Sequence, residues 1–398
     1  MLAFVIAPFL IAILVLIYRR AIKSVKSYKS GLIKVVIVIF GLLLFSGIVC
    51  TFVGFLLPNG SIMKRILTEI GYYWFGFIIY FFIGLAIALL CRSIIWLFAR
   101  KRGYNNKYAK IFTVIFVLIF TSAMSIYGIL NAHRLRITNY EVSVDKKASI
   151  DNLNVVLIAD LHLGYNVGVN EIQDMANKIN SINPDVVVLA GDIFDNEFEA
   201  IENPSELIKI FNTINPKYGK YAIYGNHDIE EKILAGFTFH TSKEERIKVQ
   251  ADTRMNKFVD DAGFIFLYDD YVLVNSDFYI YGRPDAIKTN FGNTTRLSAS
   301  EITKDLDKSK TIICLDHQPG ELRELADAGV DLDLSGHTHN GQFWPGTITI
   351  NLAWDNAYGL LKADNMTSIV TSGVGLFGPN MRTGCFPEIV NININFNK

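Results

Sequence analysis

Long apolar runs in the first third of the chain constrain its fold more than any other feature. There are four of them: Leu2–Ile17, Val35–Leu57, Tyr72–Leu90 (which could extend to Phe98) and Ile111–Leu130. A bilayer core offers no water to free backbone groups, so each run is expected to be a helix. About 20 apolar residues cross that core. The last three runs reach this length and the first is marginal, so we predict about four transmembrane helices within residues 1–132.

The first run could instead be a cleaved signal peptide. Such a peptide carries its positive charge before the apolar stretch. No charged side chain precedes Leu2, whereas Arg19 and Arg20 follow Ile17. This order favours a retained helix.

The charged residues are divided unevenly between two parts of the chain. Residues 1–140 hold 16 basic residues and 1 acidic residue, which gives a formal charge of +15. Residues 141–398 hold 22 basic and 37 acidic residues, which gives a formal charge of −15. Short loops rich in Lys and Arg stay in the cytoplasm. Such loops follow the first and third runs, so we predict a multi-pass protein of the cell membrane. Everything after Leu130 would be extracytoplasmic, although Arg134 and Arg136 argue mildly against this.

The second part has the pattern of an α/β domain, in which buried strands alternate with amphipathic helices. We predict a linker over residues 133–152 and one domain over 153–398. Its helices would include Val169–Ile182 and Glu206–Ile214. Its strands would include Asn154–Asp160, Asp185–Asp192, Lys220–Asp228, Thr311–Pro319 and Val330–His339.

Each of these five strands ends in side chains that can bind a metal ion. They are Asp160, His162, Asp192, Asn226, His227, His317, His337 and His339. Ligands of open α/β sheets bind beyond the carboxyl ends of the strands, so these side chains are expected to converge. Gly191, Gly225 and Gly336 directly precede three of the strand-end residues. A side chain there would crowd the site, or the backbone needs a positive φ.

The kinds of side chain indicate which metals would bind. Imidazole and carboxylate groups without thiolates suit Mn, Fe or Zn. The set is too large for one tetrahedral ion, so we expect two divalent metal ions that share a carboxylate. A pair of ions can clamp the attacking and leaving oxygens of a phosphoryl displacement.

The motifs at these strand ends resemble those of the calcineurin-like metallophosphoesterases, over roughly residues 153–389. In order they are "DLH", "GDIFD", "GNHD", "LDHQP" and "GHTH", at Asp160–His162, Gly191–Asp195, Gly225–Asp228, Leu315–Pro319 and Gly336–His339. The tail at Ser372–Ile389 resembles the bacterial membrane-associated branch of the family. The fold implied is a four-layer α/β/β/α sandwich.

The resemblance also implies roles for individual residues. One metal would be held by Asp160, His162, Asp192 and His339, and the other by Asp192, Asn226, His317 and His337. His227 would be the general acid, oriented by Asp195, with Asp228 as a weaker candidate for support.

The implied function is that of a membrane-anchored hydrolase acting on a phosphodiester or pyrophosphate bond. The tether favours a substrate on the bilayer, such as a phospholipid or a lipid-linked pyrophosphate. The acidic domain lacks the basic footprint of a nucleic-acid binder. The alternative is a non-enzymatic metal-binding sensor or scaffold. Transport is disfavoured, because Arg92 is the only candidate charge within the apolar runs.

Some features stay open at this stage. Segments Ile229–Arg254 and Arg283–Ser300 lie between motifs, and Arg283 and Arg296 could contact a phosphate or be solvated charges. Phe343–Gly346 ("FWPG") could form an apolar lip near the bilayer or a plain turn of packed aromatics. Cys314 and Cys385 could form a disulfide or remain buried thiols.

Overall fold

The computed structural model describes residues 2–25, 31–99, 106–231, 233–234, 237–238, 252–288 and 295–397. The described chain forms two compact units, a helical one made mostly of residues 1–131 and an α/β one made mostly of residues 132–398. Part of each basic loop, most of the segment Ile229–Arg254 and the middle of Arg283–Ser300 lie outside the described residues.

The helical unit contains four helices. They are α1 (Leu2–Val25), α2 (Gly31–Leu56), α3 (Ile62–Ala99) and α4 (Asn106–Ala132). Among the described residues, three spans are long and apolar enough to cross a membrane: Gly31–Leu56, Ile62–Phe98 and Tyr108–Ala132. A fourth span in α1 stays a prediction.

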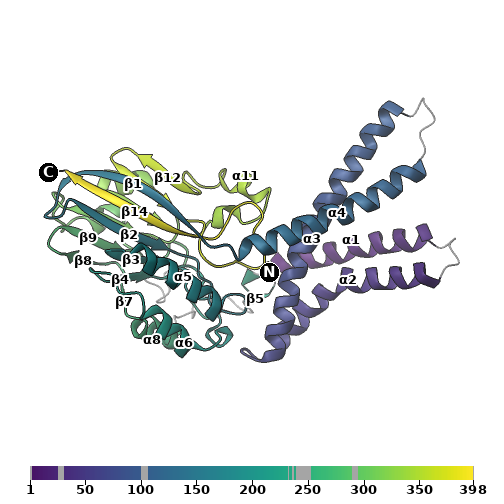
Figure 1. Cartoon of the computed structure of the whole chain (residues 1–398), viewed down its shortest axis with the longest axis horizontal. Coiled ribbons are helices and arrows are strands. Elements are labelled where there is room, and N and C mark those ends of the chain that lie inside the picture. The colour runs from purple at the N-terminus through teal and green to yellow at the C-terminus, as the bar shows by residue number, and fades with distance from the viewer. Residues whose placement is uncertain are drawn as a thin grey trace. The chain divides into compact units, whose positions relative to one another are not determined.

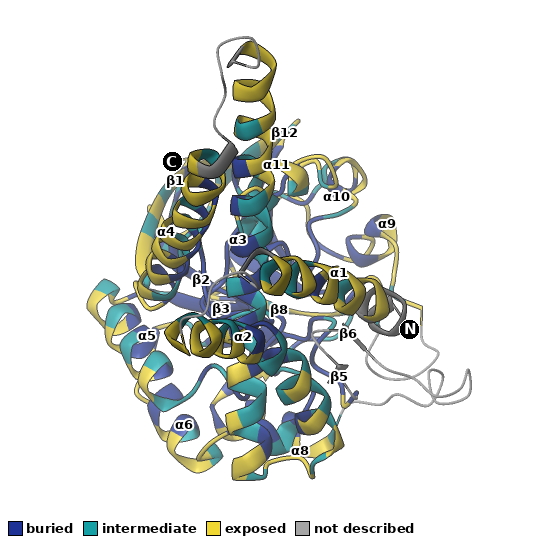
Figure 2. Ribbon diagram, turned by 90° about the vertical axis from the view of Figure 1, so that its right-hand side faces the viewer, coloured by how far each residue is buried: buried dark blue, intermediate teal, exposed yellow. Residues whose placement is uncertain are grey.

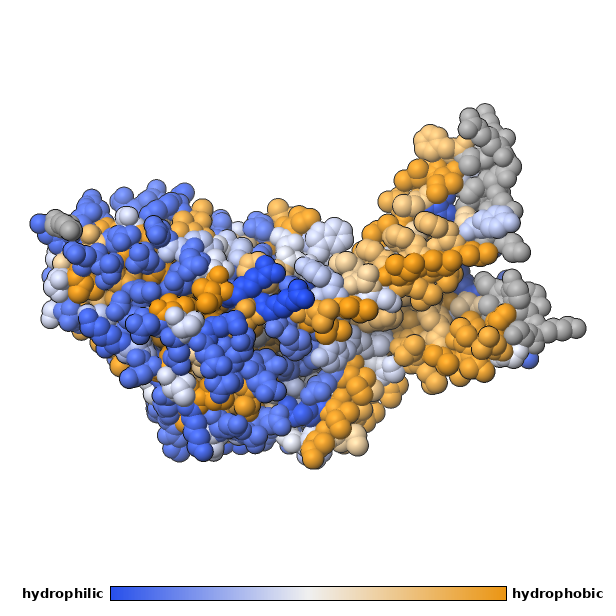
Figure 3. All heavy atoms as spheres, in the orientation of Figure 1, coloured by the Kyte–Doolittle hydropathy of each residue, from blue (hydrophilic) through white to orange (hydrophobic). Residues whose placement is uncertain are grey.

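Many residues of these helices are exposed, as the yellow parts of α1, α2 and α4 in Figure 2 show. Their outward residues are mainly apolar, whereas the surface of the α/β unit is mainly hydrophilic (Figure 3). Inside the helical unit, glycines let helices approach each other closely. A Cβ on Gly47 would lie 2.0 Å from the Trp74 ring, whose Nε1–H donates to the Leu43 carbonyl at 2.9 Å. Small residues commonly mediate helix contacts in membranes.

The α/β unit is built on two six-stranded sheets (Figure 1). The first has the order β1-β14-β2-β3-β4-β7 and the second β12-β13-β11-β10-β9-β8. Strands of the first sheet are β1 (Arg136–Lys147), β14 (Glu388–Asn397), β2 (Asn152–Ile158), β3 (Val186–Ala190), β4 (Lys220–Ile223) and β7 (Phe264–Phe266). Strands of the second are β12 (Gly359–Ala363), β13 (Met366–Val370), β11 (Leu332–Ser335), β10 (Thr311–Leu315), β9 (Phe278–Gly282) and β8 (Asp270–Val274).

Helices cover the outer face of each sheet. Those on the first sheet are α5 (Val169–Ile182), α6 (Pro204–Phe211) and α8 (Thr253–Asp261), and those on the second are α9 (Ala299–Ile302) and α10 (Leu322–Ala328). Short elements complete the unit: the 3-10 helices η2 (Phe198–Ala200) and η3 (His339–Gly341), and α11 (Gly346–Ile350). Strands β5 (Ile233–Leu234) and β6 (Phe237–Thr238) form a separate two-stranded sheet that is grouped with the helical unit.

Strand side chains alternate between the two faces of the sheet, and here both faces are buried. In β2, Val156 and Ile158 pack against the helices, while Val155 and Leu157 join the cluster between the sheets. That cluster also contains Ile313 of β10 and Leu332 of β11. The order helix, sheet, sheet, helix confirms the predicted four-layer sandwich.

One strand was not foreseen. Residues 133–152, treated above as a linker, contain β1, which pairs in parallel with β14 from Arg136 to Lys147. Only Val142 and Val144 of β1 are buried, because it is an edge strand with a mostly exposed face. Its polar sequence therefore carries little of the hydrophobic signal by which buried strands are recognised.

Candidate metal centre

The candidate ligands follow the carboxyl ends of parallel strands in both sheets. Asp160 and His162 follow β2, and Asp192 follows β3. On the second sheet, His317 follows β10, and His337 and His339 follow β11. Backbone hydrogen bonds continue past these ends, from Asp160 N–H to the Gly191 carbonyl (3.0 Å) and from Gly336 N–H to the His317 carbonyl (3.1 Å).

Several candidate ligands adopt the left-handed backbone conformation, which is uncommon outside glycine. The φ angles are +53° at Asp160, +48° at His162, +51° at Asp192, +70° at His337 and +48° at His339. Such residues cost on the order of 1–3 kcal/mol each and cluster at functional sites. The strain turns each side chain sharply out of its strand direction toward the shared edge.

Glycines permit the close approach of the ligand loops. A Cβ on Gly336 would lie 2.6 Å from Asp160 Oδ2 and from Ala159 Cβ. A Cβ on Gly191, where φ is +84°, would lie 2.6 Å from His317 Nδ1. Both contacts are far inside van der Waals distance, so these two positions need glycine, in agreement with the sequence prediction.

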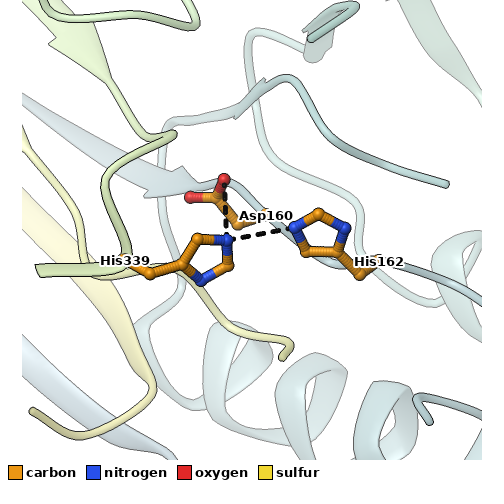
Figure 4. A group of neighbouring side chains, drawn as sticks. All are labelled: Asp160, His162 and His339. Carbon is orange, nitrogen blue, oxygen red and sulfur yellow. Dashed lines mark hydrogen bonds and ion pairs between the residues drawn. The ribbon is translucent and has the colours of Figure 1, made fainter. Parts of the chain in front are cut away.

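The first group of facing atoms comes from Asp160, His162 and His339 (Figure 4). His162 Nε2 and His339 Nε2 are 3.0 Å apart, and His339 Nε2 is 3.5 Å from Asp160 Oδ1. All three side chains are buried, and Asp160 is held by the His337 N–H, which donates to both carboxylate oxygens at 3.0 and 3.1 Å.

The second group comes from Asp192, His317 and His337. His317 Nε2 lies 3.3 Å from His337 Nδ1 and 3.2 Å from Asp192 Oδ2. His317 Nδ1 is 2.9 Å from the Ala190 carbonyl, to which it donates. This hydrogen bond fixes the tautomer, so that the Nε2 lone pair points at the group.

Asp192 connects the two groups. Its Oδ2 lies 3.2 Å from His317 Nε2 in the second group and 3.7 Å from His162 Nε2 in the first. Its Oδ1 accepts from the His227 N–H at 2.8 Å, which fixes the carboxylate plane. One oxygen facing imidazole nitrogens on both sides is the arrangement that a carboxylate shared by two ions requires.

These atoms fit divalent cations in spacing and in kind. Two nitrogens at about 2.1 Å from one ion and at a right angle to each other are about 3.0 Å apart. The two Nε2 atoms of the first group have this separation. Asn226 fits as well: it follows Gly225, whose backbone lies against Asp192 and His317. Its buried Oδ1 has no hydrogen-bond partner among the described residues.

The pKa shifts reflect charges packed in a dry site. Burial raises the pKa of Asp160 to about 6. Burial acts on Asp192 in the same direction, but the charges of His317 and His227 outweigh it and hold the pKa of Asp192 well below its usual value. Burial lowers the pKa of His337 to about 3 and that of His339 well below its usual value. Both rings are therefore neutral at pH 7 and offer lone pairs.

His227 lies beside the first group with its own set of partners. Its ring centroid is 5.0 Å from that of His162, and its Nδ1 is 3.5 Å from Asp195 Oδ1. Burial would raise the pKa of Asp195, but hydrogen bonds with His162 and His227 lower it to about 2, so this carboxylate is charged at neutral pH. His227 and Asp195 therefore lie within ion-pair distance, and the orienting role of Asp195 stays a prediction.

A closer partner of His227 was missed by the sequence analysis. Asn196 Oδ1 lies 2.5 Å from His227 Nδ1, and Asn196 Nδ2 donates to the Ile229 carbonyl at 3.1 Å. Asn196 is fully buried and has a φ of +61°. Its position directly after the "GDIFD" motif was the only available signal. Asp228, the weaker candidate for support, accepts from the backbone N–H groups of Phe194 (2.8 Å) and Gly225 (2.6 Å).

Arg382 is a second residue that the sequence analysis missed. Its fully buried guanidinium donates to the carbonyls of Ser372 (2.8 Å), Gly373 (3.3 Å) and Gly375 (2.6 Å). Its Nη2 is also 3.3 Å from His339 Nδ1. Arg382 thus holds the C-terminal segment against the first group. Only its place in the tail motif could have drawn attention to it.

Arg283 and Arg296 form ion pairs that the sequence analysis did not foresee. Arg283 is fully buried and pairs with Asp316 at 2.9 Å, and Arg296 pairs with the same carboxylate at 3.0 Å. Both also contact Glu321. Both guanidiniums are thus paired with carboxylates, and their shared partner Asp316 directly precedes His317. Cys314 and Cys385 are both buried free thiols in the structure.

Comparison with known proteins gives a consistent set of similarities. Residues 153–341 match the family model described as calcineurin-like phosphoesterase. An uncharacterised metallophosphoesterase of Campylobacter jejuni is 30% identical over 79% of this chain and 75% of its own length. A transmembrane protein with metallophosphoesterase domain from Danio rerio is 30% identical over 70% of this chain and 62% of its own length. An uncharacterised metallophosphoesterase of Aquifex aeolicus is 28% identical over 67% of this chain and 95% of its own length.

The geometry at Asp192 predicts the effect of removing its charge. We expect Asp192→Asn to lower the Mn content of the purified full chain, because the oxygen that faces both groups loses its charge. Metal per chain measured by mass spectrometry checks this. Asp333→Asn is the matched control: Asp333 is equally buried but hydrogen-bonds to Ser335 and Ser368. Unchanged metal content in Asp192→Asn, or an equal loss in Asp333→Asn, would contradict the assignment.

Proposed function

We propose that this chain is a membrane-anchored hydrolase of phosphodiester or pyrophosphate bonds, because it belongs to the calcineurin-like phosphoesterase family. The observation that supports this most is the position of Asp192 Oδ2, which faces ring nitrogens of both candidate ligand groups at 3.2 and 3.7 Å. A site with one shared carboxylate and two sets of donors suits two-metal phosphoryl chemistry.

In this proposal Asp160, His162, Asp192 and His339 hold one divalent ion. The second divalent ion is held by Asp192, which is shared with the first ion, and by Asn226, His317 and His337. Their mixture of imidazole, carboxylate and amide donors suits Mn, Fe or Zn. When bound, such ions supply Lewis-acid stabilisation of the phosphoryl oxygens and lower the pKa of water.

The protein's own residues orient the site. His317 donates through Nδ1 to the Ala190 carbonyl, which keeps its other nitrogen directed at the second group. Asp160 is fixed by the His337 N–H, and Asp192 by the His227 N–H. Because these supports are backbone groups of neighbouring ligand loops, each loop positions the side chain of another.

His227 is the proposed general acid toward the leaving-group oxygen. Asn196 Oδ1 and Asp195 Oδ1 both face its Nδ1, at 2.5 and 3.5 Å, so Nε2 is the nitrogen directed away from these partners. A ring held this way can carry a proton on Nε2 while Asp195 balances the charge. Asp195 also lies 3.7 Å from His162 Nδ1, which couples the acid to the first ligand group.

The direct test is hydrolysis by the full chain in detergent with added Mn. Turnover of bis(p-nitrophenyl) phosphate is expected, with a loss of about 100-fold or more in Asp192→Asn. Release of p-nitrophenol gives the rate. A folded, metal-loaded chain that fails on aryl diesters and on pyrophosphates alike would favour a metal-binding sensor or scaffold.

The acid role of His227 predicts a dependence on the leaving group. We expect His227→Ala to retain its metal content and to slow alkyl phosphodiesters by about 10²–10⁴-fold, because a poor leaving group needs the proton. Aryl diesters, whose leaving groups need little protonation, should slow much less. His133→Ala is the control, since the His133 side chain is 50% exposed. Equal slowing for both kinds of diester would rule out the acid role.

The charge of the loops supports an extracytoplasmic catalytic domain. Arg19, Arg20 and Lys23 lie in the last two turns of α1, and Lys34 lies in the first turn of α2. A reporter enzyme that needs disulfide bonds, fused after Asn397, is expected to be active. The same reporter fused at Asn106 should be inactive. The opposite pattern would place the domain in the cytoplasm.

A further inference from the structure

An exposed apolar ridge follows the last pair of candidate ligands. It consists of Trp344, Ile348 and Leu352, which are 42%, 61% and 85% exposed; Ile348 lies in the short helix α11, Trp344 precedes this helix and Leu352 follows it. No residue of α11 is buried. Single exposed apolar residues are ordinary, but several close together in one segment are typical of an interaction site.

The loop that carries the ridge begins and ends at the metal centre. It leaves directly from His339 through η3, and at its base the Thr338 hydroxyl donates to the Ala357 carbonyl at 2.6 Å. Near its end, the Trp354 ring lies 5.4 Å from the ring of His337. Whatever covers the ridge is therefore brought next to the site at which phosphoesters would be cleaved.

The same loop is fixed to the segment that meets the start of β1. The Gln342 carbonyl accepts from the N–H groups of Thr383 (3.1 Å) and Gly384 (3.2 Å), and Trp344 N–H donates to the Thr383 hydroxyl at 3.1 Å. Three residues after Thr383, the Phe386 ring packs under the Arg136 guanidinium at 4.2 Å. Arg136 N–H also donates to the Pro387 carbonyl at 2.9 Å.

Arg136 is the first residue of β1 and comes only four residues after Ala132, the last residue of α4. Four residues of extended chain reach at most about 14 Å. The end of a helix that crosses the bilayer is therefore close to Arg136, and Arg136 is close to the loop that carries the ridge.

We infer that the ridge inserts into the surface of the bilayer that the chain itself spans, and that the substrates are phosphoesters of lipids in that bilayer. The second part of this inference rests on the proposed function. A tryptophan beside aliphatic side chains is the composition of interfacial membrane contacts. Because only three residues join α4 to β1, a bilayer crossed by α4 would be present near this domain at a high effective concentration in every molecule.

Depth-dependent quenching tests the insertion without relying on activity. The full chain is reconstituted in vesicles of phosphatidylcholine with or without bromine on the acyl chains. The emission of Trp344 is taken as the difference between the native chain and Trp344→Phe. Strong quenching of this difference by brominated lipid is expected, and an unquenched difference would overturn the insertion. The tryptophans Trp74, Trp96 and Trp354 are common to both samples.

A comparison of two substrates tests the substrate class. The variant Trp344→Ser/Ile348→Ser/Leu352→Ser is compared with the native chain in vesicles, on bis(p-nitrophenyl) phosphate in solution and on two lipids, dioleoyl phosphatidylglycerol and dioleoylglycerol pyrophosphate. Hydrolysis of the cleaved lipid should fall by about tenfold or more, because the site loses its alignment with the bilayer, while the soluble diester changes by less than about twofold. The soluble rate also shows that the variant is folded.

The control variant carries the same number of serines elsewhere on the domain. Ile265→Ser/Leu273→Ser/Leu360→Ser removes side chains that are 46%, 40% and 37% exposed, and it should retain lipid hydrolysis. An equal loss in the control, an equal loss on both kinds of substrate, or a native chain that cleaves the soluble diester but neither lipid would overturn the lipid substrate. A native chain that cleaves nothing would refute the proposed function, and quenching would still decide the insertion.

Discussion

Atoms that carry lone pairs face one another at a single dry sheet edge, and the rest of the α/β unit is arranged to keep them there. His162 Nε2 and His339 Nε2 are 3.0 Å apart, and Asp192 Oδ2 meets ring nitrogens on two sides. Such atoms approach each other closely only where a proton or a cation can lie between them. Left-handed turns, glycines without room for a Cβ and a buried guanidinium hold the groups in place.

The candidate ligands could be predicted from the sequence because each stands directly after a buried strand. Runs such as "VVLIAD" and "DVVVLAGD" indicate a buried strand by their apolar residues and the end of that strand by the aspartate that follows. The same pattern predicts sheets buried on both faces, since Val155 and Val156 face opposite sides and both are apolar, whereas the four-layer order was implied by the family resemblance. Backbone direction and hydrophobicity are local properties, so a single sequence reveals them.

Contacts between distant segments could not be predicted in this way. Arg283 reads as a surface charge, yet it is fully buried because Asp316, 33 residues later, balances it. A buried charge without such a partner would be strongly destabilising. Asn196 and Arg382 were missed for the same reason, since their partners His227 and His339 come from other loops. Strand β1 was missed because an edge strand exposes one face and need not be apolar.

The connection between α4 and the α/β unit is short, so it limits the distance of this unit from the end of α4. Residues 133–135 are the only residues between α4 and β1, and β1 continues directly into the sheet through its pairing with β14. A short tether still leaves the domain free to rotate about one attachment point. A second contact with the bilayer at the Trp344 ridge would remove most of that freedom. Because the loop of the ridge starts at His339, the contact that fixes orientation and the contact that positions a ligand belong to one continuous segment.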